Sequence, residues 1–394
     1  MTGSPLTFAQ AIDRSCDAAR SVVLRYRRAV QLGATPLEDR RLKDLLEKTS
    51  IREGLRIFHL LSYRGVEVDV LDETSLMHTH TLKSIDGCVT LAHCLLRGYQ
   101  RIVVESGGNT ATAIAAYARP HGVQVFCFVP GENLPLLDAD SAHVIAVETP
   151  GLVKDVARRF AQASGVHRVP ETEWRYQAAM FIGCFLLEHL LEGASFDFLV
   201  QTISAGFGPI GMYRALDAYG WDTHVSPRFL GVQQETNAPV YRAWKAGATQ
   251  VEPTALTSTA GLLTPVMYDG APQTYGTFPE LKTLLQRTRG ELTTLSQADF
   301  ERWLFSEGAE GDVLRRLRDH GVTIGIRDGE VVDKTGLIAL AATLREIARG
   351  RIPRASRVVV CLTSGAHVAG GTMSAECRVS EPASIDGYAE RWRV

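Results

Sequence analysis

The sequence has little net charge and lacks any long apolar run. Its 394 residues include 42 lysines and arginines against 44 aspartates and glutamates, which gives a formal net charge of −2. This balance argues against the basic surface that nucleic-acid-binding proteins present. No stretch reaches 18 consecutive apolar residues, so we expect no membrane span. The first residues lack the basic-then-apolar pattern of a signal peptide, and we expect a soluble, cytoplasmic protein.

The sequence also lacks the pattern of a disulfide-stabilised protein. Its seven cysteines are an odd number, lie far apart and stand mostly among apolar neighbours. They are typical of buried free thiols in a reduced compartment. With 45% apolar residues, a chain of this length buries enough surface to fold without disulfides or structural metals.

Short apolar runs alternate with helical patterns from residue 55 onward. The runs at 101–106, 123–129, 143–148, 196–204, 229–234 and 357–363 predict buried strands, and 109–117, 152–163, 174–191, 209–219 and 335–348 predict helices. Continuous apolar strands separated by helices are typical of a parallel sheet covered on both faces. We therefore predict an α/β fold whose ligands bind beyond the carboxyl ends of the strands.

Two regions of the chain do not follow this alternation. Residues 1–54 are amphipathic and carry interleaved acidic and basic side chains. They predict a helical extension that packs on the main body or on a partner subunit. Residues 235–295, rich in threonine, proline and glycine, are typical of loops and short elements.

Three predicted strand-to-helix junctions are rich in small and hydroxyl residues. At 105–110, glycines allow the backbone to approach a ligand, but taken alone this junction is better explained as a capped flexible turn. At 204–211, glycines at 206, 208 and 211 expose N–H groups at a helix start, which favours an anion. Close helix packing would explain one or two of these glycines. At 361–364, a hydroxyl pair follows the last strand, where a simple strand-end cap is the alternative.

A fourth segment, 72–84, places a lysine just before an apolar helical pattern. Taken alone, Lys83 could be an ordinary surface residue, which is the usual position of a lysine. His78 and His80 are two residues apart, but no cysteine or carboxylate stands at a ligand spacing from them. We therefore predict no metal site.

Together and in this order, the segments resemble the fold type II pyridoxal-phosphate (PLP) enzymes, the tryptophan synthase β-like superfamily, and especially its threonine synthase branch. The resemblance spans roughly residues 50 to 370, and the motifs that carry it are 72–74, 77–86, 106–110, 115–118, 231–239 and 360–365. It implies two lobes, 55–195 and 196–394, each a mostly parallel sheet flanked by helices. We also expect a homodimer, and the charge balance and lack of a long apolar run predict no nucleic-acid or membrane partner.

The resemblance implies a role for each motif. Lys83 would form the Schiff base with PLP and move protons at the substrate α-carbon. Asn109 would donate to the ring 3′-oxygen, and Thr363 or Ser364 would meet the pyridine nitrogen. The 5′-phosphate would lie in a cradle made by Gly206, Phe207, Gly208 and Gly211. The amino acid substrate would be bound by Thr81, Ser106, Gly107, Gly108 and Thr110, with His80 nearby.

The implied activity is a threonine synthase-like elimination or replacement on an O-activated or hydroxy amino acid, through an external aldimine and an aminoacrylate-type intermediate. The chain departs from the branch pattern, because His78 and His80 replace a proline and a glycine, and 84–86 lacks the branch's arginine. The substrate therefore stays open, including one of secondary metabolism. The alternatives are a serine or threonine dehydratase or racemase on the same fold, or a catalytically silent regulatory subunit.

Overall fold

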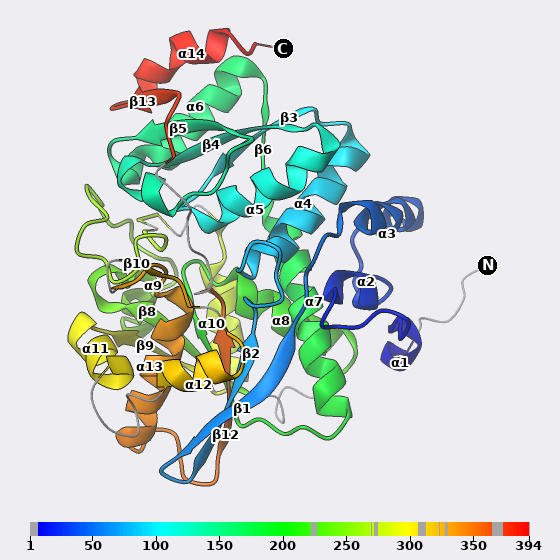
Figure 1. Cartoon of the computed structure of the whole chain (residues 1–394), viewed down its shortest axis with the longest axis vertical. Helices are drawn as coiled ribbons and strands as arrows, with labels where there is room; N and C mark the ends of the chain where they lie inside the picture. Colours follow the sequence, from blue (N-terminus) through cyan, green and yellow to red (C-terminus); the bar gives the residue numbers. More distant parts are fainter. Residues whose placement is uncertain are drawn as a thin grey trace.

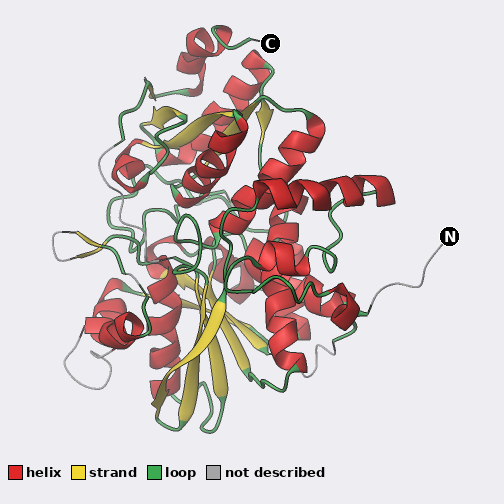
Figure 2. Ribbon diagram, turned by 45° about the vertical axis from the view of Figure 1, so that its right-hand side comes forward, coloured by secondary structure: helices red, strands yellow, loops and turns green. Residues whose placement is uncertain are grey.

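A computed structural model describes residues 7–393, except 222–226, 269, 272–274, 306–312, 323, 328–329 and 365–372. Two main sheets lie at opposite ends of the molecule, with helices around and between them (Figures 1 and 2). The prediction of an α/β fold with mostly parallel sheets is confirmed.

The larger sheet has the strand order β1-β2-β12-β7-β8-β9. Its strands are β1 (Arg56–Tyr63), β2 (Val66–Asp72), β7 (Phe198–Thr202), β8 (Arg228–Gln234), β9 (Glu291–Leu295) and β12 (Arg357–Leu362). All neighbours are parallel except the hairpin β1–β2. We call this sheet, with the helices that cover it, the body.

The smaller sheet is parallel throughout, in the order β13-β5-β4-β3-β6. Its strands are β3 (Arg101–Glu105), β4 (Gln124–Pro130), β5 (His143–Val147), β6 (His167–Arg168) and β13 (Cys377–Val379). We call this sheet and its helices the small lobe. A separate hairpin pairs β10 (Ile326–Arg327) with β11 (Glu330–Val331).

The helices follow the predicted pattern where the sequence alternates strongly. They are α1 (Phe8–Ala11), α2 (Val22–Tyr26), α3 (Pro36–Thr49), α4 (Lys83–Arg97), α5 (Asn109–Ala118), α6 (Val153–Ser164), α7 (Thr172–Leu191), α8 (Phe207–Ala218), α9 (Pro239–Lys245), α10 (Phe278–Arg287), α11 (Gln297–Phe305), α12 (Val313–Asp319), α13 (Thr335–Ala348) and α14 (Asp386–Glu390). Short 3₁₀ helices cover Arg119–His121, Gly131–Leu136, Pro150–Leu152, Glu235–Asn237 and Pro382–Ile385. Across the described residues, none of the helices combines the length and the apolar character needed to cross a bilayer.

Sheet membership does not follow a division of the chain at residue 195. The hairpin β1–β2 precedes that point but belongs to the body, because β2 pairs with β12. Conversely, β13 returns from the end of the chain to pair with β5 in the small lobe. The two lobes are thus interleaved in sequence, and 55–195 and 196–394 stay a proposal for folding units.

The N-terminal extension packs against the rest of the chain through buried side chains and an ion pair to α7. Arg25 Nη2 lies 2.6 Å from Glu188 Oε1 on α7, and the Tyr26 hydroxyl donates to the same carboxylate at 2.5 Å. Leu42 and Leu46 of α3 are fully buried. The seven cysteines are all free, and five of them are buried.

Candidate active site

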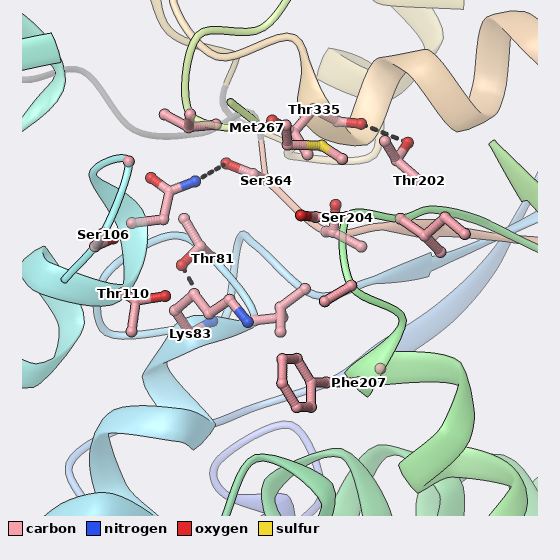
Figure 3. A pocket seen from close by; sticks show the side chains of 18 of the residues that line it. Thr81, Lys83, Ser106, Thr110, Thr202, Ser204, Phe207, Met267, Thr335 and Ser364 are labelled. Carbon is pink, nitrogen blue, oxygen red and sulfur yellow. Dashed lines mark hydrogen bonds between the residues drawn. The ribbon is translucent and has the colours of Figure 1, made fainter. Parts of the chain in front are cut away.

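A pocket lies between the two sheets and is lined by residues from both (Figure 3). Four helices begin at its wall, with Lys83 of α4, Asn109 of α5, Phe207 of α8 and Thr335 of α13. The N-terminus of a helix carries unpaired N–H groups and a partial positive charge. Their convergence favours a ligand with more than one negative group.

Lys83 lies on the wall of this pocket and is tied to the end of β12. Leu82 N donates to Thr363 O at 3.2 Å, and Thr81 forms a β-bridge with Ser364. Lys83 N donates to Thr81 Oγ1 at 3.1 Å, and its side-chain Nζ lies 2.7 Å from Asp86 Oδ2. The segment at 72–84 and the hydroxyl pair at 363–364, far apart in sequence, therefore meet.

Glu73 is a fully buried carboxyl close to this lysine segment. Among the described residues, neither of its side-chain oxygens has a hydrogen-bond partner of ordinary geometry. Burial raises the pKa of Glu73 to about 8, although the nearby Cys361 thiol and the charge of the Lys83 ammonium both act to lower it. At neutral pH the group therefore holds its proton.

The glycine-rich loop after β7 opens toward the pocket at three of its four predicted positions. Gly206, Phe207 and Gly208 line the pocket, and Gly206 has the left-handed φ of 87°. A Cβ on Gly208 would lie 2.8 Å from Gln201 Nε2. Gly211 does not line the pocket: a Cβ there would meet Ala179 Cβ at 2.5 Å. Packing of α8 on α7 therefore explains Gly211.

The loop before α5 brings four of its five predicted residues to the pocket: Ser106, Gly107, Asn109 and Thr110. Gly108 does not line the pocket, and its N–H donates to Ser106 Oγ at 3.1 Å. A Cβ on Gly107 would lie 2.3 Å from Val266 O. Here glycine is required for close approach to a neighbouring loop.

Thr363 and Ser364 both line the pocket but differ in their partners. Ser364 Oγ donates to Asp333 Oδ2, and Asn109 Nδ2 lies 2.9 Å from the same oxygen. Thr363 Oγ1 is buried and has no hydrogen-bond partner in the part of the chain that the structure describes. Of the two predicted hydroxyls, Thr363 is thus the one with a hydrogen left to donate.

His80 lies outside this pocket. With His78 it lines a separate depression beside Asp138 and Asp140, on the far side of α5. The His78 ring packs edge-on against Tyr117, with ring centroids 5.6 Å apart, and burial lowers the pKa of His78. Within the described residues, no group of three histidine, cysteine or carboxylate side chains has metal-binding geometry.

The structure adds two cations to the pocket that the sequence analysis missed. The Arg175 guanidinium lies over the Phe207 ring at 5.0 Å and over the Tyr275 ring at 5.4 Å. Lys154 Nζ lies 4.3 Å from the centroid of Tyr275 and donates to Ala271 O. Both line the pocket. Lys154 lies on α6 and Arg175 on α7, and the charged residues of neither helix form a motif typical of a ligand site. No local sequence signal therefore distinguishes these two residues from surface cations.

Comparison with known proteins relates this chain to a family. Residues 72–297 match the family described as "Pyridoxal-phosphate dependent enzyme". A cysteate synthase of Methanosarcina acetivorans is 26% identical over 196 residues, which are 46% of either chain, so the match spans about half of that relative.

Solved structures agree on the fold. Threonine synthase from Escherichia coli superposes with a TM-score of 0.61 at 12% identity, over 98% of this chain and 97% of that one. The processed form of threonine deaminase isoform 2 from Solanum lycopersicum superposes with a TM-score of 0.59 at 14% identity, over 100% of this chain and 97% of that one. At such identities the superpositions establish a shared fold and leave the substrate open.

Proposed function

The chain belongs to the family of pyridoxal-phosphate-dependent enzymes, and we propose that it catalyses an elimination or replacement on an amino acid with an O-activated or hydroxylated side chain. One observation carries the proposal: Lys83, Asn109, the loop 206–208 and Thr363 meet in a single pocket. Bound PLP would supply an electron sink for the bond broken at the substrate α-carbon. The residues of the chain supply binding, orientation and proton transfer.

The residues present fit the cofactor. The loop 206–208 offers backbone N–H groups at the start of α8. An added Cβ at Gly208 would crowd Gln201, so this position favours glycine and a ligand can lie directly against the loop backbone. Such a site suits a phosphate. The unpartnered hydroxyl of Thr363 is suited to a ring nitrogen. A neutral hydroxyl does not stabilise a protonated ring as a carboxylate would, which favours elimination and replacement over transamination.

Lys83 would attach the cofactor and then carry a proton to and from the substrate α-carbon. Asp86, 2.7 Å from its Nζ, stabilises the protonated amine between these transfers. Ser106, Gly107 and Thr110 at the start of α5 would hold the substrate carboxylate, where the helix dipole adds to their hydrogen bonds.

Arg175 and Lys154 support a substrate with a second negative group. Both cations line the pocket, and Arg175 Nε is buried without a hydrogen-bond partner among the described residues. A buried guanidinium N–H is costly unless a ligand or water accepts from it. An amino acid whose activated oxygen bears a phosphate would supply that acceptor.

The test is to incubate the PLP-loaded protein with O-phospho-L-serine, O-phospho-L-homoserine, L-serine and L-threonine while recording visible spectra, phosphate and ammonia. We expect a spectral change and phosphate release with a phosphorylated substrate. Arg175→Leu should raise the KM for the phosphorylated substrate by about tenfold or more, because a charge-assisted hydrogen bond is lost. The control Arg158→Leu, on an exposed arginine of α6, should leave KM unchanged. Absence of any spectral change or product with all four compounds would refute the proposal.

A further inference from the structure

A buried carboxylate at the edge of the pocket, Asp333, has two differently used oxygens. Asp333 is 5% exposed and stands two residues before α13. Its Oδ1 accepts from Thr335 N at 2.9 Å and from Thr335 Oγ1 at 2.6 Å. This is the local turn by which aspartate commonly starts a helix. Starting the helix in this way uses only Oδ1.

The other oxygen, Oδ2, contacts two residues that line the pocket. Asp333 Oδ2 accepts from Ser364 Oγ and, at 2.9 Å, from Asn109 Nδ2. Both donors line the pocket. Ser364 follows β12 of the body, whereas Asn109 begins α5 of the small lobe. One carboxylate oxygen therefore joins the two sides of the pocket.

A carboxylate constrains both partners because it can only accept hydrogen bonds. Ser364 uses its single O–H on Asp333, and its Oγ accepts from Asn109 Nδ2 at 3.4 Å. The Asn109 amide must therefore direct its NH₂ toward Asp333 and Ser364, and the longer contact, to Ser364, leaves one N–H for the ring 3′-oxygen. Without the carboxylate, the Asn109 amide would be free to turn over and present its carbonyl oxygen instead.

We infer that Asp333 is a positioning residue that, together with Ser364, fixes the Asn109 amide for the bound cofactor and links the small lobe to the body across the pocket. This inference rests on the proposed role of Asn109 at the cofactor ring. Hydrogen bonds to a charged acceptor are about twice as strong as neutral ones, so the link is suited to holding both donors.

The decisive variant is Asp333→Asn, which keeps shape but replaces an acceptor-only group with an amide. Its NH₂ group must face either the turn at Thr335 or the Ser364–Asn109 pair. Because the backbone N–H of Thr335 cannot rotate away, the NH₂ should face the Ser364–Asn109 pair and displace one of these donors. We expect PLP to bind about tenfold more weakly, as is typical when an outer residue that orients a ligating group is lost. We also expect the absorption maximum of bound PLP to shift, because the donor at the ring 3′-oxygen is misplaced.

Two controls separate positioning from folding. Glu53→Gln changes another fully buried carboxylate that accepts several hydrogen bonds, including one from Tyr117, but does not line the pocket. It should lower Tm without moving PLP affinity or spectrum. In an Asn109→Ala background, Asp333→Asn should change PLP affinity by less than about twofold, because the group that it positions is gone.

Should Asp333→Asn fail to fold, Ser364→Ala removes one partner of Oδ2 and leaves the turn at Thr335 intact. It should weaken PLP binding and shift the spectrum in the same direction. Wild-type affinity and spectrum in the folded Asp333→Asn or Ser364→Ala protein would overturn the inference. Failure of the wild type to bind PLP through Lys83 would instead overturn the proposed function, so the two failures are distinguishable.

Discussion

The body and the small lobe contribute to the same pocket by different kinds of attachment. In the body, the lysine segment is bound to the end of β12 by the backbone hydrogen bond from Leu82 and the bridge from Thr81. The small lobe reaches the body at the pocket through the side chain of Asn109, which donates to Asp333 Oδ2. Backbone-anchored groups suit a permanently held cofactor, and side-chain contacts suit a part that responds to substrate.

The largest effect should follow from removing the Lys83 amine. Lys83→Ala should give folded protein without Schiff-base absorbance and without an adduct reducible by borohydride. The other lysine of the pocket, Lys154, lies over the Tyr275 ring and donates to Ala271 O, so we do not expect it to take over the imine. A reducible adduct that persists in the variant would exclude Lys83 as the attachment point.

A charge placed in the body's phosphate loop should come next. Gly208→Asp introduces a carboxylate beside the anion site, and we expect PLP affinity to fall by at least about a hundredfold. Global stability should change far less. Gly387→Asp, on α14 with open space around its Cβ, is the matched control. Equal PLP occupancy of the Gly208 variant and wild type would refute the cradle.

A pH effect should arise from the body's buried acid. The pKa of Glu73 is raised to about 8 in the folded chain, so between about 4.5 and 8 the folded state holds a proton that the unfolded state releases. Stability should therefore fall as pH rises through this window. Glu73→Gln should remove the decline, so Tm of the variant relative to wild type should rise with pH. Parallel Tm curves for the two proteins would contradict the burial of an ionisable Glu73.

The smallest effect is expected on the small lobe. Thr110→Val removes one hydroxyl from the expected carboxylate site while PLP stays bound, so turnover should fall by about fivefold to tenfold. We also predict that the small lobe closes on the body when the substrate carboxylate binds, so Thr110→Val should weaken this closure. Hydrogen exchange with and without a substrate analogue measures it. Unchanged protection over 110–178 in the wild type would show that the small lobe does not close on the substrate.

Sequence reasoning succeeded where the signal is local. The runs that predict strands at 101–106, 123–129 and 143–148 are observed as β3, β4 and β5, because continuous apolar runs between helices have few other solutions. The predicted junctions converge because the carboxyl ends of strands β7 and β12 share one edge of a parallel sheet.

It failed where the partner is distant in sequence. The hairpin β1–β2 joins the body through β12, almost 300 residues later, and no local pattern encodes that pairing. Asp333 has a readable turn with Thr335, but its second contact, to Asn109, is 224 residues away. Gly211 and His80 carry motif-like spacing, yet one packs against α7 and the other lies in a separate depression.

The most direct test of the central claim is to map the cofactor on the wild-type chain. Two lysines, Lys83 and Lys154, line the pocket. The PLP-loaded protein is reduced with borohydride, digested and sequenced by mass spectrometry. We predict a single phosphopyridoxyl group on Lys83, at the start of α4. A label on Lys154, or on any lysine outside the pocket, would contradict the account.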